Sequence, residues 1–243
     1  MKKLSFFIAM FLLFSSALFA QVGINTSTPE PTAMLDVTSS NKGFLPPRMT
    51  TTQRGQIFDP ATGLTIYNTS KNCIETYNGS SWVSNTHYIG ESYGGGIVFY
   101  VYDKGQHGLI AATADQSTGI SWYGGTNTNT RARADGVGAG LKNTSIIIAN
   151  QGPVDGDAFA ATVCNEYSVT VGGVTYGDWY LPSKYELNLL YLQKSVVGGF
   201  AYNYYWSSSE YGVSSAWYQH FDDGGQSNAN KGCTYYVRAV RAF

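Results

Sequence analysis

Hydrophobic and polar positions first show a strand pattern in the middle of the chain. Residues 97–102 form a continuous apolar run behind three glycines, which is typical of a strand buried on both faces. Asp103, Lys104 and Gly105 turn the chain. Residues 109–113 are then predicted to form the partner strand.

Strand patterns return near the C-terminus. Runs rich in aromatic and β-branched residues cover residues 204–209, 216–221 and 234–243. The polar segments 210–215 and 222–232 separate these runs and are predicted as turns and loops. Strands are therefore expected at both ends of the C-terminal part of the chain.

Helix signals lie between the two sets of strands, after a long loop at 121–140. Residues 143–151 form one short candidate. In 157–167 apolar residues recur on one helical stripe, and Asp157 is placed to cap the helix. The stripe consists of Phe159, Val163 and Tyr167.

The segment 181–195 has the strongest helix signal. Ser183 followed by Glu186 makes a capping box, and Leu187 and Leu190 supply a face to bury. Strands at both ends with helices between them predict an α+β fold.

The preceding region, residues 21–88, has a different pattern. Around residues 64–66, 74–77 and 82, short apolar groups alternate with polar turns, which predicts a small meander of strands. The region has few apolar residues for its length and cannot bury a core alone. We expect it to pair with other copies of itself or to pack on the following domain.

The first twenty residues have the order of a secretory signal. Lys2 and Lys3 precede an apolar stretch at 6–14, and small residues lead to a cleavage position after Ala20. An uncleaved anchor is the alternative, but the stretch is short for a membrane span. The prediction is a secreted, extracellular or outer-surface protein with no transmembrane segment in the mature chain.

Composition narrows the function classes. Charged residues make up only 13% of the chain, and the formal net charge is −1. Removal of the signal takes away two lysines and makes the mature chain more negative, so nucleic acid is not expected as a partner. Three cysteines exclude a dense disulfide scaffold. The 28 glycines and 19 tyrosines suit β-structure with many loops.

Motifs for catalysis or cofactors are not found. The glycines at 94–96 precede a strand, and those at 136–140 lack the lysine of a phosphate-binding loop. The three histidines are dispersed, so no catalytic residue, metal ligand or cofactor is predicted. The oxygen-rich segment from Asp222 to Asn230 fits a hairpin turn better than a calcium loop, which stays an alternative.

Two cysteines leave a question open. Cys164 falls beside the apolar stripe of the second helix, and Cys233 begins the last strand. An exported protein can oxidise such a pair to a disulfide. The alternative is two buried free thiols.

Aromatic and polar residues near loops form the remaining signal. Tyr and Trp offer large, rigid contact surfaces at low entropy cost, and polar neighbours can bind hydroxyl groups. For each aromatic residue the alternative is a place in the core. The candidate ligand-binding residues are Trp122, Tyr123, Arg131, Arg133, Glu210, Tyr218, Asp222 and Lys231.

Five segments in the C-terminal part carry a resemblance to a known family. They are GGGIVFYVYDKGQHGLIAAT, DWYLPSKYELNLLY, YYWSSSEY, AWYQHFDDGG and VRAVRAF. Together they resemble the DUF1566 family, which includes the C-terminal domain of the Legionella collagen-like adhesin and the major paralogous domains of Fibrobacter. The resemblance spans residues 90–243.

That resemblance implies a fold related to C-type lectin and formylglycine-generating-enzyme domains. The adhesin relatives bind sulfated glycans and form trimers, which implies binding rather than catalysis. This chain lacks collagen repeats and is slightly acidic, which gives little general attraction to sulfated glycans. An oxidase of the formylglycine-generating type would need a reactive cysteine pair holding copper.

The N-terminal segments VGINTSTPEPTAMLDV, KGFLPPRMTTTQR and GLTIYNT resemble stalks of Bacteroidetes surface proteins and of phage tail fibres. This implies an extended, trimeric stem. The predicted organisation is a signal at 1–20, a β-rich stem at 21–88 and a head at 89–243. The predicted function is a non-enzymatic, adhesin-like protein whose head binds a glycan or surface polymer; a structural fibre or envelope component is the alternative.

Overall fold

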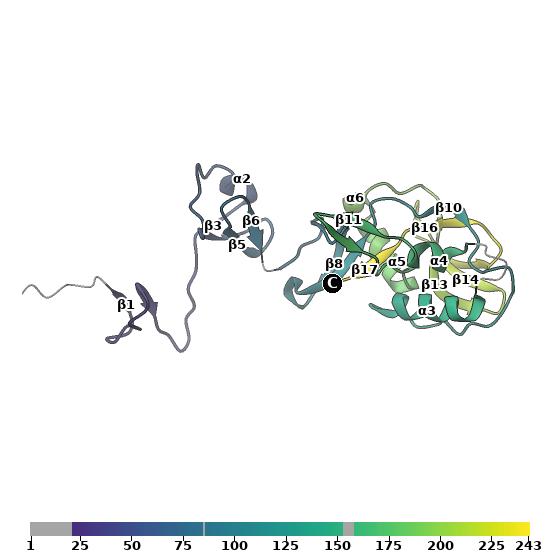
Figure 1. The fold of residues 1–243 in the computed structure, drawn as a ribbon, viewed down its shortest axis with the longest axis horizontal. Helices are drawn as coiled ribbons and strands as arrows, with labels where there is room; N and C mark the ends of the chain where they lie inside the picture. The colour runs from purple at the N-terminus through teal and green to yellow at the C-terminus, as the bar shows by residue number, and fades with distance from the viewer. Residues whose placement is uncertain (1–20, 85, 153–157) are drawn as a thin grey trace, which may run out of the picture.

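The computed structural model describes residues 21–84, 86–152 and 158–243 (Figure 1). The predicted signal at 1–20 and the predicted cap Asp157 lie outside these residues. Below, stem means residues 21–88 and head means residues 89–243. The described chain is mixed α+β, as expected.

The first sheet of the head is a four-stranded antiparallel sheet in the order β17-β9-β8-β7. It confirms that residues 109–113 partner the run at 97–102, because β9 pairs with β8 across a short 3-10 turn. The strands are β7 (Ser92–Tyr93), β8 (Gly96–Tyr102), β9 (His107–Ala111) and β17 (Val240–Ala242), and the turn is η1 (Asp103–Gly105).

The second sheet of the head has five strands in the order β10-β16-β13-β14-β15. In Figure 1 it lies towards the end of the head farther from the stem, whereas β8 and β17 lie on the stem side. Its strands are β10 (Ser117–Ile120), β13 (Tyr204–Gly212), β14 (Ser215–His220), β15 (Gln226–Asn230) and β16 (Tyr235–Val237).

Three sequence predictions near the C-terminus need correction. The turn expected over 210–215 is confined to two residues, since β13 extends through Gly212 and β14 begins at Ser215. The segment 222–232, expected to be turn and loop, contains strand β15. Five residues, 221–225, suffice for the turn, and pairing with β14 satisfies backbone hydrogen bonds of this polar edge strand. The run 234–243, expected as one strand, divides into β16 and β17 in different sheets. Between them the buried Arg238 binds Asp115, with its Nε 2.7 Å from the carboxylate oxygen.

Helices form where the pattern predicted them. The third candidate is confirmed with its cap, since Ser183 Oγ accepts the N–H of Glu186 and Glu186 accepts the N–H of Ser183. The second begins at the N-cap Phe159, whose N–H donates to Thr162 Oγ1. The helices of the head are α3 (Ala139–Gln151), α4 (Ala160–Asn165), α5 (Lys184–Leu192) and α6 (Lys194–Val197), and a hairpin of β11 (Val169–Val171) and β12 (Val174–Tyr176) lies between them.

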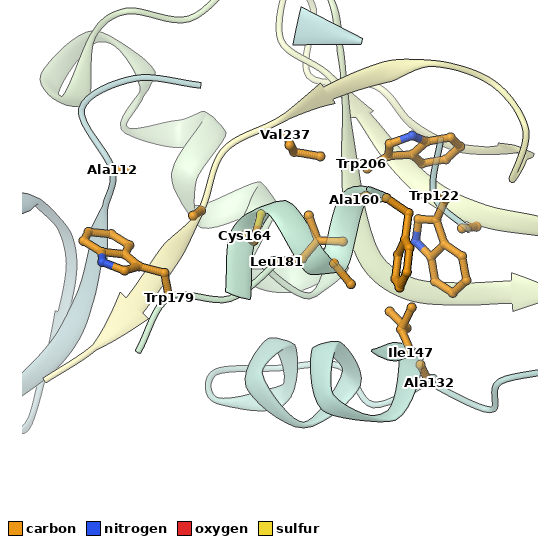
Figure 2. Packing of buried hydrophobic residues seen from close by; sticks show 14 of the residues in the cluster. Ala112, Trp122, Ala132, Ile147, Ala160, Cys164, Trp179, Leu181, Trp206 and Val237 are labelled. Atoms are coloured by element: carbon orange, nitrogen blue, oxygen red, sulfur yellow. The ribbon is translucent and has the colours of Figure 1, made fainter. Parts of the chain in front are cut away.

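The head has two hydrophobic cores, and successive residues of its strands point to different ones. Val98 belongs to the first core and Phe99 to the second, so this strand is buried on both faces as predicted. Tyr205 and Trp206 alternate in the same way on β13. Figure 2 shows side chains of the first core, among them Trp122, Trp206, Cys164 and Leu181.

The stem contains the predicted meander but little core. Strands β4, β5 and β6 pair antiparallel in order, which confirms the meander. The parallel pairs β1–β2 and β3–β4 and the one-turn helix α2 were not predicted from the pattern. The elements are β1 (Val22–Ile24), β2 (Leu35–Val37), β3 (Arg48–Met49), α2 (Thr51–Arg54), β4 (Thr65–Asn68), β5 (Cys73–Tyr77) and β6 (Trp82–Ser84).

Most large apolar side chains of the stem are exposed. Ile66, Cys73 and Pro46 are its buried apolar residues among those described, and Phe58 is 96% exposed. Further exposed apolar residues are Val22, Ile24, Met34, Leu35, Val37, Phe44, Leu45, Ile74 and Val83. The expectation that the stem has no adequate core of its own is confirmed for the described residues.

Candidate functional site

Three of the eight predicted ligand-binding residues are buried, and for these the prediction is wrong. Trp122 and Lys231 have no exposed surface, and Glu210 is 3% exposed. Trp122 belongs to the first core, where its Nε1 donates to the carbonyl of Ser207 at 2.8 Å. A side chain without solvent-exposed atoms cannot contact a ligand at the surface.

The buried pair Lys231–Glu210 instead holds a surface loop in place. Lys231 Nζ lies 2.7 Å from Glu210 Oε1 and also donates to the carbonyls of Thr128 and Val213, both at 2.9 Å. Its ammonium group lies 4.6 Å from the centre of the Trp122 ring. The pair therefore joins the loop around Thr128 to strand β13, to the turn between β13 and β14, and to the residue that follows β15.

Glu210 completes this attachment. Its carboxylate accepts the N–H groups of Thr130 at 2.8 Å and Arg131 at 2.9 Å. Burial alone would raise the pKa of Glu210, but the hydrogen bonds from Lys231 and from these two N–H groups outweigh it and hold the pKa below its usual value. Glu210 is thus an ionised structural residue beneath the loop.

Arg131 and Arg133 lie on the outside of that loop, where the sequence placed them. Arg131 is exposed, with a left-handed backbone φ of 61°. Arg133 is half exposed, and its Nε lies 3.6 Å from Glu210 Oε2. The loop thus presents two guanidinium groups, and their contact with a ligand stays a prediction.

Tyr218 belongs to an aromatic group that we call the tyrosine cluster: Tyr204, Tyr218, Tyr235 and His220. The three tyrosine rings lie 5.1 Å apart from one another, centre to centre. His220 lies 4.7 Å from Tyr204, its direct partner across β13 and β14. Tyr204 is 37% exposed and the other members are half-buried.

The tyrosine cluster is packed rather than hollow. Its rings are tilted by 42° to 76° to each other and are too close to admit a cation between them. Beneath it, the buried Trp206 lies 4.5 Å from Tyr235. Because the rings stand on three paired strands over a tryptophan, they present a fixed aromatic surface with few rotamers to lose on binding.

Asp222 lies in the turn at one edge of this surface. It is exposed, and its carbonyl accepts from Lys194 Nζ at 3.0 Å. The next residue, Asp223, accepts the N–H of Gly225 at 2.8 Å and lies 3.1 Å from His220 Nδ1. The N–H of Gly225 is the main cause that lowers the pKa of Asp223. These contacts confirm the hairpin turn at this position.

Tyr123, the remaining predicted residue, is half-buried and packs against the first core. Of the two states left open for Cys164 and Cys233, the structure has free thiols and no disulfide between them. Cys164 is fully buried, and burial raises the pKa of its thiol, whereas Cys233 is half-buried. The alternative of a buried free thiol holds for Cys164.

Tyr204, Tyr235 and His220 were missed among the candidate residues. The alternation of side chains along a strand could have identified them, because every second residue lies on the same face. Tyr204 and Trp206 share one face of β13, and their partners His220 and Tyr218 lie on the same face of the sheet in β14. Reading this face requires the strand register, which the sequence alone does not supply.

No helix within residues 21–84, 86–152 and 158–243 is long and apolar enough to cross a bilayer. Over the same described ranges, no group of three His, Cys, Asp or Glu side chains is arranged to hold a metal ion.

Comparisons with known families gave two matches, one over each part of the chain. A family model described as the Lcl C-terminal domain matches residues 111–241, which is more than half of the chain. The chain therefore belongs to the Lcl C-terminal domain family, and the resemblance of the head is confirmed at this level.

A second model, described as a phage tail like trimerisation region, matches residues 23–130. This match supports a homotrimer and continues beyond the predicted stem, so the two matches overlap at 111–130. A comparison with curated proteins gave no match.

Proposed function

We infer that this protein is a secreted or surface-exposed, non-enzymatic, adhesin-like protein in which a trimeric stem presents a head that binds a glycan or surface polymer. Both family matches are consistent with an adhesin-like or structural surface protein. In this proposal the signal at 1–20 is cleaved, and the head is related to C-type lectin domains.

The observation that carries the proposal is the tyrosine cluster. Sugar rings have apolar faces that stack on aromatic side chains, and tyrosine hydroxyls at the rim can bind sugar hydroxyls. Three tyrosines 5.1 Å apart on a five-stranded sheet supply such a surface. The rings are held by strands, which favours binding because little side-chain entropy is lost.

The charges around the tyrosine cluster favour a neutral ligand. His220 lies beside the carboxylate of Asp223 at 3.1 Å, and Asp222 is exposed in the same turn. These carboxylates oppose an anionic ligand at this edge. The exposed Arg131 and Arg133 lie on a different loop and would supply a secondary contact with longer polymers.

The trimer is supported by the exposed apolar residues of the stem. Strands β1 and β2 have three residues each, and none of their side chains is buried. A two-stranded pair of this length is not stable in water without further packing. Packing of three stems against each other covers Val22, Ile24, Leu35 and Val37 and removes this apolar surface from water.

An oxidase function has less support. Metal binding and nucleophilic chemistry need a thiolate, and burial makes the thiol of Cys164 harder to ionise.

The structural-fibre alternative shares the trimeric stem and differs only in the absence of a ligand.

Binding of purified residues 21–243 to an array of neutral and sulfated glycans tests the proposal. Tyr204→Ala and Tyr218→Ala should each reduce binding at least tenfold, whereas Tyr202→Ala, a change at an 80% exposed tyrosine outside the cluster, should not. Circular dichroism checks that each variant is folded. A folded, trimeric wild type that binds no glycan would favour the structural-fibre alternative instead.

A further inference from the structure

A cavity lies where the stem meets the head. It has a volume of about 580 Å³, within the range of small-molecule sites. Its wall combines the turn before β5, the linker after β6 and the end of β8 with the following turn. The side chains that matter most for its chemistry are Lys71, Lys104, His87, Tyr88 and Tyr102.

One wall of this cavity is firmly attached to the head. The N–H of His87 donates to the carbonyl of Gly105 at 2.8 Å. Gly105 has a φ of 84°, and a Cβ there would lie 2.4 Å from the carbonyl oxygen of His87, so no other residue fits. The ring of His87 lies 3.8 Å from Tyr93 and 4.7 Å from Phe243. The linker therefore lies directly on the head.

The stem wall carries an excess of positive charge. Glu75 is 1% exposed and faces two cations, with Arg54 Nη1 at 2.8 Å and Lys71 Nζ at 3.0 Å. The single negative charge of Glu75 therefore neutralises only one of these two positive charges. Lys71 Nζ also lies 4.3 Å from the centre of the Tyr88 ring, which places its charge at the cavity wall.

The head wall adds a second ammonium group. Lys104 is exposed and held at a left-handed φ of 55° in η1. The neighbouring carboxylates are Glu91, which lies 2.9 Å from His87 Nδ1, and the exposed Asp103. Neither lines the cavity, and its described lining contains no carboxylate.

We propose that this cavity binds a uronate-type ligand, a hydroxylated ring that carries one carboxylate. Lys104 and Lys71 would receive the carboxylate, since charge-assisted hydrogen bonds are the stronger ones. Tyr102, 45% exposed, and Tyr88 offer ring faces, and Ser70, Asn72 and Thr86 offer polar groups for hydroxyls. Because the walls come from both parts of the chain, an occupant joins the stem to the head.

Calorimetric titration of the full chain with glucuronate, and with glucose as the neutral counterpart, tests this site. Glucuronate should bind saturably and glucose at least tenfold more weakly. Lys104→Gln should reduce glucuronate affinity about tenfold, because one charged hydrogen-bond donor is lost. Lys142→Gln, a matched change at an exposed lysine of α3, should leave it unchanged.

Two further readouts distinguish binding in this cavity from binding at the tyrosine cluster and from a general loss of folded protein. Tyr204→Ala should not affect glucuronate binding, and Tyr102→Ala should weaken it. Glucuronate should also slow proteolysis in the linker at 86–89. Equal binding of glucose and glucuronate, an undiminished affinity of Lys104→Gln, or no saturable binding of glucuronate to the full chain would overturn the proposal.

Discussion

Replacement of Lys231 by methionine is the sharpest test of how the head is held together. Methionine keeps most of the apolar length of the lysine side chain and removes the ammonium group. That group makes three hydrogen bonds of 2.7 to 2.9 Å and lies 4.6 Å from the Trp122 ring, with no exposed surface. The change leaves the carboxylate of Glu210 buried without its cation.

The expected cost follows from that geometry. Removing one partner of a buried ion pair costs about 3–5 kcal/mol, because the remaining charge stays buried and uncompensated. Two carbonyls, of Thr128 and Val213, lose a donor as well. For a protein of this size about 3–5 kcal/mol corresponds to a decrease in Tm of roughly 6–20 °C.

Denaturant unfolding followed by tryptophan fluorescence measures this loss, since Trp122 and Trp206 are buried in the head. Lys142→Met is the matched control and should stay within about 0.5 kcal/mol of wild type. The double variant Lys231→Met with Glu210→Gln should be less destabilised than the sum of the single changes by about 1–3 kcal/mol. A loss below about 1 kcal/mol, or strict additivity, would refute the assignment of a buried, ionised pair.

Four further expectations concern other features. Ser183→Ala should cost about 1 kcal/mol in the unfolding free energy, because the cap of α5 is lost, and an unchanged value would contradict the capping geometry. Gly140→Ala should cost about 1–3 kcal/mol although alanine favours helices, since its Cβ would lie 2.4 Å from Glu186 Oε2; a gain in stability in the same assay would refute this. As pH falls through the lowered pKa of Glu210, its contribution to stability should be lost, beginning near the unfolded value of about 4.3, and Glu210→Gln should flatten this dependence in pH-dependent unfolding. Phe58→Asp should shift trimers to monomers in sedimentation experiments while the head keeps its Tm, and persistent trimers at micromolar concentration would exclude Phe58 from the interface.

Much of the fold could be read from the sequence because it depends on neighbouring residues. The capping box of α5 is satisfied by residues three positions apart, so the motif and the structure agree. The apolar run of β8 and its pairing with β9 follow from a short turn. The scarcity of apolar residues in the stem likewise indicated that this region lacks a core of its own.

The candidate binding surface could be predicted only in part. The sequence named Tyr218 and the exposed Arg131 and Arg133 as candidates, but it grouped them with Trp122 and Lys231, which are buried. A tryptophan next to a loop has the same sequence pattern whether it faces solvent or the core. A lysine is rarely fully buried, and this burial depends on distant partners: the carboxylate of Glu210, 21 positions away, and the carbonyls of Thr128 and Val213.

By itself, then, the sequence determined the α+β class, the capped helix, the first strand pair and the poorly packed stem, since hydrophobic periodicity and capping act over a few residues. Tertiary structure decided which aromatic residues are exposed and which neighbours they have. Tyr204, Tyr218 and Tyr235 meet only because β16 pairs with β13 and β13 with β14 in one register. That register is set by long-range packing of both sheets between two cores, and no local pattern specifies it.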